Sequence, residues 1–241
     1  MFRIILTFLV LNFYAAPIFA QFVGEIQMEL VSPQGNGQMT FIFGSQAERM
    51  DMLITPPQFS APMKTSMILK HENPDEAYIL MDATKSYMVL DLKKAAAVTG
   101  GLNVDEEYDV KVIGKEKIRG YQCQHVKITG ATTDMDLWLS SEILDFDTFR
   151  RLQSQNPKMS NSALADALHK SGADGFPVKM LQQVNGQTVK MELVKAEKKA
   201  IPASAFSIPK DYQQMQPQMQ MSQEQMEKMK EMMKKLQEQK R

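Results

Sequence analysis

Cysteine, like tryptophan, occurs only once in this chain. Cys123 is the only one among 241 residues, so no intramolecular disulfide can form. Cys123 and His125 lie two residues apart on one predicted strand, so they share a face and are about 6.6 Å apart along it. Such a pair could form half of a metal site, or the histidine could activate the thiol. No Cys-x-x-Cys or second His/Cys pair accompanies them. We therefore interpret Cys123 as a buried structural thiol beside a partly exposed histidine.

The chain also lacks an excess of charge of either sign. Lysine and arginine together number 28, and aspartate and glutamate also number 28. A nucleic-acid partner is thereby disfavoured, because binding to phosphates requires a basic surface.

Sequence motifs of catalysis are missing as well. There is no Gly-x-Ser-x-Gly, no P-loop and no dinucleotide-binding glycine pattern. His71-Glu72 lacks the second histidine of a helical zinc motif, and His169 falls where a helix C-terminus favours a cation. Asp134 and Asp136 share a strand face, which is typical of a solvated surface. The sequence predicts neither an enzyme nor a cofactor.

No apolar run is long enough to span a membrane. The run from Ile4 to Phe13 follows Arg3 and is shorter than the roughly 20 residues of a membrane helix. Small residues and Pro17 end it before Gln21. Residues 1–20 are therefore predicted to be a cleaved signal peptide rather than an anchor, and no cysteine follows that would carry a lipid. The mature chain, with a net charge of −1 after the loss of Arg3, is expected to be periplasmic or secreted.

Strand signals fill most of the remaining chain. Residues 24–31 place Ile26, Met28 and Leu30 on one face and polar residues on the other, as a strand with one wet face does. Asn185-Gly186 between two apolar runs predicts a type I′ hairpin turn. In total we predict about eleven strands, at residues 24–31, 38–43, 47–54, 64–71, 77–82, 86–92, 108–117, 121–129, 132–140, 176–184 and 189–197.

Two short helices are predicted between the ninth and tenth strands. The first carries Phe146 and Phe149 at helical spacing, and the second, capped by Ser160 or Ser162, carries Leu164 and Leu168. The strands at residues 77–82 and 86–92 are apolar on both faces, so something must cover a second face there. We expect the two helices to be this cover.

Three stretches of the sequence carry a resemblance: Gly120-Tyr121-x-Cys123, the strand with Trp138, and Phe206-Ser207-Ile208-Pro209. They resemble the core of a family of bacterial exported proteins that is known only as a domain of unknown function. The resemblance covers residues 24–209. It extends distantly to the carriers of outer-membrane lipoproteins, and so implies a curled half-barrel around helices. The predicted fold is thus mainly β (α+β): a curled antiparallel sheet covered by two helices, at residues 21–209.

Methionine is unusually frequent, with 20 residues, and seven of them lie between Met215 and Met233. We predict a flexible linker at residues 210–221 and a Met-rich amphipathic helix at residues 222–241, with a capping box at Ser222 and Gln225. Met226, Met229, Met233 and Leu236 form an apolar seam of that helix. Inside the domain, methionines at alternating positions indicate either an ordinary core or an adaptable apolar cavity.

Three functions remain open at this point. The first is a non-enzymatic carrier that holds an apolar ligand or lipid. The second is a copper(I)-binding protein, because thioethers select Cu(I). Its candidate ligands are the tail methionines Met219, Met221, Met226, Met229 and Met233. The third is an interaction protein that docks on a protein partner through its C-terminal helix. We favour the carrier.

Overall fold

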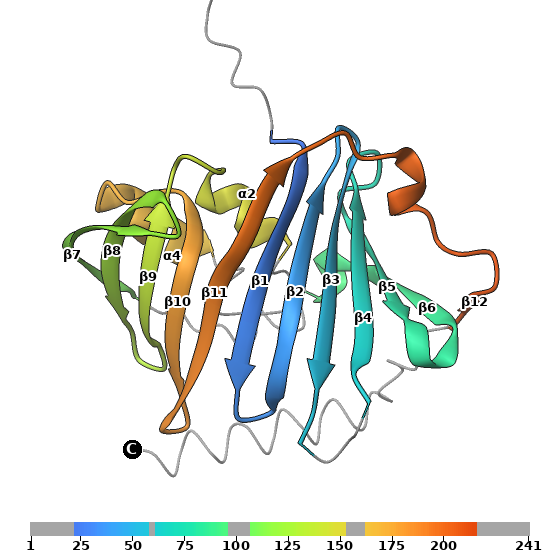
Figure 1. Ribbon diagram of the computed structural model, residues 1–241, viewed down its shortest axis with the longest axis horizontal. Helices are drawn as coiled ribbons and strands as arrows, with labels where there is room; N and C mark the ends of the chain where they lie inside the picture. Colours follow the sequence, from blue (N-terminus) through green and yellow to red (C-terminus); the bar gives the residue numbers. More distant parts are fainter. Residues whose placement is uncertain (1–21, 58–60, 96–106, 153–161, 216–241) are drawn as a thin grey trace, which may run out of the picture.

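The computed structural model describes residues 22–57, 61–95, 107–152 and 162–215. One twelve-stranded sheet dominates it (Figure 1). The strands are β1 (Gly24–Ser32), β2 (Gly35–Phe43), β3 (Ala47–Thr55), β4 (Met63–Lys70), β5 (Glu76–Met81), β6 (Ser86–Asp91), β7 (Asp109–Ile118), β8 (Tyr121–Thr129), β9 (Asp134–Ser140), β10 (Phe176–Val184), β11 (Gln187–Lys198) and β12 (Gln213–Gln214). The helices are α2 (Phe146–Arg151), α4 (Ser162–Lys170) and the 3₁₀ turns η1 (Asp82–Thr84) and η2 (Ala203–Phe206).

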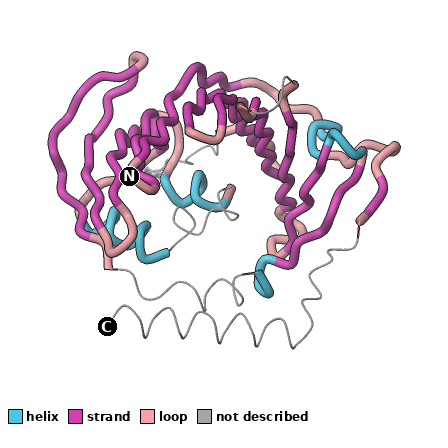
Figure 2. Tube along the Cα trace, turned by 90° about the horizontal axis from the view of Figure 1, so that it is seen from below, coloured by secondary structure: helices cyan, strands magenta, loops and turns pink. Residues whose placement is uncertain are grey.

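The sheet consists of two runs of hairpins that meet at β1. Its strand order is β12-β6-β5-β4-β3-β2-β1-β11-β10-β9-β8-β7, and every neighbouring pair is antiparallel except β12 and β6. Figure 2 shows the sheet as an arch with helical segments inside its curve. The predicted class, a mainly β half-barrel with short helices, is confirmed.

All eleven predicted strands are present, with small differences at their ends. The Asn185-Gly186 turn is also confirmed, because both residues have the positive φ that a type I′ turn requires, 51° and 76°. The alternation in β1 is real: Ile26 and Met28 are buried, whereas Gln27 and Glu29 are exposed.

The sheet continues beyond the expected boundary at Ile208-Pro209. The main chain of Gln213 donates to the carbonyl of Lys85 over 2.9 Å, and that of Met215 donates to the carbonyl of Tyr87 over 2.7 Å. Residues 213–214 thus form β12, which has no apolar pattern to reveal it because both residues are exposed glutamines. The predicted linker therefore cannot begin at residue 210, and its remainder, with the predicted tail helix, lies outside the described residues.

The main core lies on the concave side of the sheet. Phe41 of β2, Phe149 of α2 and Phe176 of β10 contact one another edge to face, with ring centroids 5.3–6.1 Å apart. Leu164 and Leu168 of α4 are buried in the same core. The two predicted helices thus exist. Asp145 caps α2 by accepting from the Thr148 main chain over 2.7 Å, which satisfies one unpaired donor of the first turn.

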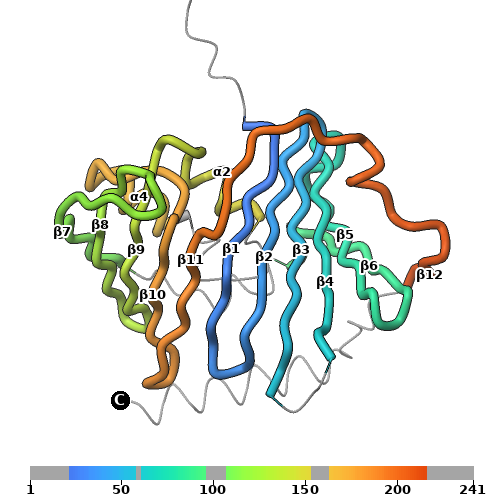
Figure 3. The backbone as a smooth tube through the Cα atoms, in the orientation of Figure 1, coloured from blue at the N-terminus to red at the C-terminus, as the bar shows by residue number. Residues whose placement is uncertain are grey.

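The helices do not provide the predicted second cover of β5 and β6. That cover is the segment after β11, which crosses the convex side and ends at β12 (Figure 3). Its Phe206, Ile201 and Tyr212 pack with Ile68 and Leu80 in a second apolar cluster. Within the described residues, no helix is both long enough and apolar enough to cross a membrane.

Candidate functional site

The concave side of β3 to β6 carries apolar side chains that are only partly buried. We call this surface the open concave face. Its members are Met52 and Ile54 of β3, Met63 and Leu69 of β4, Ile79 and Met81 of β5, and Met88 and Leu90 of β6. Met63 is 50% exposed, and the other members are half-buried.

Strand register aligns these side chains in rows across the sheet. One row begins under the helices with Ile26, paired with Phe41, and continues through the facing pair Met50 and Met67. It then runs through Ile79 to Met88 on the outer strands. A parallel row follows the pairs Met28–Met39, Met39–Met52, Met52–Thr65 and Thr65–Met81. Methionine is therefore the main side chain of a continuous apolar surface.

Burial along these rows decreases from the middle of the sheet toward β6. Ile26 and Phe41 are fully buried, and Met50 and Met67 are 2% and 1% exposed, close to the helix-covered core. Ile79 and Met88, at the far end of the same row, remain half-buried. Among the described residues, α2 lies over the inner part of the arch, and the apolar side chains of the outer part stay half-buried.

A buried carboxylate marks the border between the covered and the open parts. The Glu48 side chain on β3 is 2% exposed and accepts from the Arg151 guanidinium at the end of α2 over 3.0 Å. His71 Nε2, just after β4, lies 3.7 Å from the same carboxylate oxygen. Arg151 is 51% exposed, but its removal would leave the buried Glu48 carboxylate without this partner, so the contact holds the end of α2 on β3.

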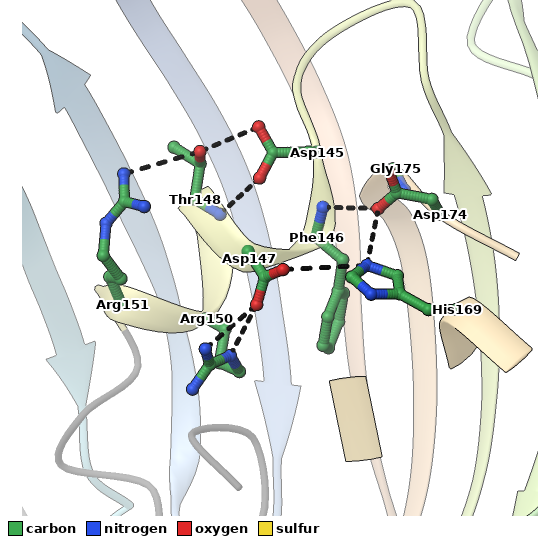
Figure 4. A network of polar contacts seen from close by, with 9 residues as sticks. All are labelled: Asp145, Phe146, Asp147, Thr148, Arg150, Arg151, His169, Asp174 and Gly175. Carbon is green, nitrogen blue, oxygen red and sulfur yellow. Dashed lines mark hydrogen bonds and ion pairs between the residues drawn. The ribbon is translucent and has the colours of Figure 1, made fainter. Parts of the chain in front are cut away.

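A polar network fixes the two helices to each other and to the start of β10 (Figure 4). Asp174 accepts from the main chain of Phe146 over 2.9 Å and from that of Gly175 over 2.7 Å. His169 of α4 lies 3.6 Å from Asp147 of α2 and 3.9 Å from Asp174. The network therefore has a structural role: its polar atoms bond to one another and hold the two helices in place.

The structure places Cys123 and His125 on the same face of β8, as predicted, but gives them separate partners. Cys123 is 2% exposed, and burial raises the pKa of its thiol. His125 stacks on Trp138 with ring centroids 4.1 Å apart, and its Nε2 lies 2.8 Å from an Asp136 oxygen. A protonated, enclosed thiol is a poor nucleophile, so this pair has the geometry of structural packing.

The convex side of β8 and β9 is a paired, charged surface. Lys127 contacts both Asp134 and Asp136, and its hydrogen bond to Asp134 raises the pKa of the lysine. The two aspartates share a face, as predicted, and their carboxylates contact Lys127 and His125. Their carboxylates are ion-pair partners.

One hollow lies at the rim of the sheet, where the segment after β11 passes the β2–β3 turn. It has a volume of ≈ 680 Å³ and is lined by Ser45, Gln46, Ala47, Lys70, His71, Glu72, Ile201, Ala203, Phe206, Ser207 and Ile208. Its charged members are ordinary surface side chains, since His71 is 38% and Glu72 73% exposed.

Metal ligation has no support in the described part of the chain. There, no group of three or more histidine, cysteine, aspartate or glutamate residues lies close enough to hold a metal ion. The alternative copper ligands Met219, Met221, Met226, Met229 and Met233 all lie outside the described residues.

Sequence reasoning missed Glu48 and the segment after β11. The signal for Glu48 was available, because alternation in residues 47–54 places it on the same face as Met50 and Met52. A carboxylate on an apolar face predicts a partner from another element. The segment after β11 gave no such signal, because its apolar residues have no regular period.

The comparisons with known proteins identify a family. A family model described as "Domain of unknown function (DUF4412)" matches residues 22–212. The family resemblance inferred from the sequence is thereby confirmed. No curated protein matches the chain.

Solved structures that match the chain share little sequence with it. PNGF-II is 12% identical with a TM-score of 0.42, over 80% of this chain and 31% of that one. A chain in the Pseudomonas aeruginosa MucA/MucB complex is 11% identical with a TM-score of 0.44, over 79% of this chain and 57% of that one. LprF from Mycobacterium bovis is 10% identical with a TM-score of 0.34, over 78% of this chain and 90% of that one. The chain therefore spans less than two thirds of the first two proteins.

Proposed function

We propose, from the premise that the chain belongs to the DUF4412 family, that it is an extracytoplasmic, non-enzymatic binding protein of the carrier type. The family description names no activity, so the proposal depends on the open concave face. Its ligand is an acyl chain or a lipid, which covers the half-buried side chains of β3 to β6.

The observation that carries this proposal is the uneven burial of one continuous apolar surface. Soluble proteins rarely leave a large contiguous apolar patch exposed unless something binds it. Here the patch lies inside a curved sheet, where a chain-like ligand meets side chains from several strands. Methionine suits this role, because its flexible thioether side chain repacks around ligands of different shape.

Energetics set a lower limit on the size of the ligand. Burial of one methylene contributes about 0.8 kcal/mol, so a chain of about ten methylenes contributes about 8 kcal/mol. Association costs about 4 kcal/mol or more in lost freedom of motion. A short-chain acid therefore gains too little free energy from burial to offset the cost of association, and we expect binding to strengthen with chain length.

A titration with a fluorescent fatty-acid analogue tests the proposal. Met81→Lys and Met88→Lys place a charge on the open concave face and should each weaken binding by at least tenfold. Val194→Lys on β11 is the matched control, because Val194 is 52% exposed and lies outside the open concave face. Equal binding by all four proteins, or no saturable binding by any, contradicts the proposal.

The copper alternative is separated by a second assay on the same samples. If the tail methionines bind Cu(I), competition against a chelator detects a tight site in the unmodified protein, and fatty acid does not displace the metal. We expect no tight copper site. The mature chain is also expected to begin near Gln21, and N-terminal sequencing of the exported protein checks this.

A further inference from the structure

Arg151 places a guanidinium at one end of the open concave face. Its Nη2 donates to the Glu48 carboxylate over 3.0 Å and to the Thr148 hydroxyl over 3.5 Å. In the strand register Glu48 of β3 lies opposite Leu69 of β4, which is a member of the open concave face. The cation therefore lies beside the Leu69 end of the apolar surface.

Glu48 uses only part of the hydrogen-bonding capacity of Arg151. A guanidinium has five N–H donors, and within the described residues both contacts of Arg151 go through Nη2, so Nε and Nη1 keep their donors. The Arg151 side chain is 51% exposed, whereas that of Glu48 is 2% exposed. Figure 4 shows Arg151 and His169 on opposite sides of α2, so Arg151 lies apart from the network that joins the helices. A ligand that approaches the pair thus meets the cation rather than the carboxylate.

The lysines at the opposite end of the face are paired with exposed or half-buried carboxylates. Lys64 lies 3.5 Å from Asp51, and Lys85 lies 2.8 Å from Asp211. Lys64 also follows Met63 on β4, so its side chain faces the other side of the sheet. The face therefore has a cationic end at Arg151 and an apolar end at Met63.

The distance between these two ends suits a long acyl chain. Ile54 lies six positions after Glu48 on β3, which corresponds to about 20 Å along the strand. In the strand register, Leu69 and Leu90 lie level with Glu48, and Met63 lies level with Ile54. An amphiphile with its head at Arg151 can thus keep its chain on apolar side chains over this whole length.

We propose that the ligand carries an anionic head group, a carboxylate or a phosphate ester, which Arg151 binds, while its acyl chain runs along the strands toward Met63 and Met81. This inference rests on the proposed function, to which it adds the class of head group and the direction of the chain. Hydrogen bonds between two charged groups are about twice as strong as those between neutral groups. Arg151 is therefore a specificity-determining residue, and lipids with an uncharged head bind less tightly.

Displacement of a fluorescent fatty-acid analogue measures the preference for the head group. Palmitic acid and hexadecyl phosphate should each bind about tenfold more tightly than hexadecanol, which has a chain of the same length without the charge. Glu48→Gln with Arg151→Gln removes the cation together with the buried carboxylate, so neither charge is left unpaired. This double variant should bind the acid and the alcohol equally, and should bind the alcohol as the unmodified protein does.

Two further variants control for charge and for the buried carboxylate. Arg150→Gln removes the same charge from the adjacent position, where the guanidinium contacts Asp147 over 2.9 Å, and should keep the preference for the acid. Glu48→Gln alone keeps Arg151 but removes the carboxylate that competes for it, and should strengthen the preference. Acetate and inorganic phosphate, which have the anion but no chain, should not displace the probe at the concentrations at which palmitic acid does.

Photolabelling gives the direction of the chain without any substitution. A fatty acid with its photoreactive group beside the carboxylate should label Leu69 and Leu90. One with the group at the methyl end should label Met63 and Met81 instead. Mass-spectrometric mapping of the two labelled proteins distinguishes these positions.

The outcomes separate the head-group assignment from the carrier function. Equal binding of acid and alcohol by the unmodified protein, or a preference that survives in the double variant, overturns the role of Arg151. A reversed labelling pattern, or displacement by acetate or phosphate alone, overturns the placement of a lipid head group at this end. Tight binding of the alcohol in any of these cases still supports the carrier function. Absence of binding by acid, phosphate ester and alcohol alike overturns both proposals.

Discussion

At the scale of single residues, the lone cysteine shows how burial decides between chemistry and packing. Cys123 is enclosed, and desolvation raises the pKa of its thiol. We expect alkylation to be slow in the folded protein and fast in denaturant. Cys123→Ser should lower the free energy of unfolding by about 1 kcal/mol, because a hydroxyl costs more to bury than a thiol. Thiol titration and urea unfolding measure both effects, and rapid labelling of the native protein contradicts a structural role.

Tyr212 gives the protein a predictable response to alkaline pH. Its hydroxyl donates to Asp82 over 2.6 Å, and this bond together with burial raises the pKa of Tyr212 to about 12. A raised pKa favours the neutral form in the folded state, so this contribution to stability is complete below pH about 10 and is lost as the pH rises toward about 12. Tyr212→Phe should remove that part of the decline in the free energy of unfolding. An identical decline in both proteins over this range counts against the assignment.

At the scale of elements, the segment after β11 acts as a clamp on the convex side. A Cβ atom on Gly44 would lie 2.6 Å from Cε2 of Phe206, so the ring needs a glycine beneath it. Gly44→Ala should cost about 1–2 kcal/mol of stability through this clash. Phe206→Ala should cost about 3 kcal/mol through lost packing.

The double variant is the informative measurement for this clamp. Phe206→Ala removes the ring that Gly44→Ala clashes with, so the combined cost should be smaller than the sum of the two single costs. Gly114→Ala is the control, because no heavy atom lies within 4 Å of the Cβ added there, and its cost should be small. Strict additivity in thermal or urea unfolding contradicts the contact between the clamp and the β2–β3 turn.

The same clamp shows where prediction from sequence stops. The period-two pattern of Ile26 and Met28, and the turn residues Asn185 and Gly186, are local signals, and both predict the structure correctly. The cover of β5 and β6 is not local. The sequence shows that Tyr78 and Leu80 need partners on the second face, but only three-dimensional proximity assigns Phe206 to them rather than the two helices.

The candidate site, too, could be predicted only as far as local patterns in the sequence reach. Alternation places Met50, Met52, Met67 and Met88 on one side of the sheet, but it cannot grade their burial. That gradient depends on how far α2 reaches across the arch, which the contacts of Phe149 with Phe41 and of Arg151 with Glu48 determine. Both contacts join residues about a hundred positions apart, beyond the reach of any pattern in the chain.

At the scale of the whole molecule, we propose that the half-barrel holds an apolar ligand inside its curve. The most direct test is photolabelling of the full-length protein with a long-chain fatty acid that carries a photoreactive group, followed by mass-spectrometric mapping. We expect saturable labelling on Met52, Met81, Met88 and Leu90, which excess unlabelled fatty acid suppresses. Labelling confined to exposed residues outside this face, such as Val194, or labelling that does not saturate, contradicts this function.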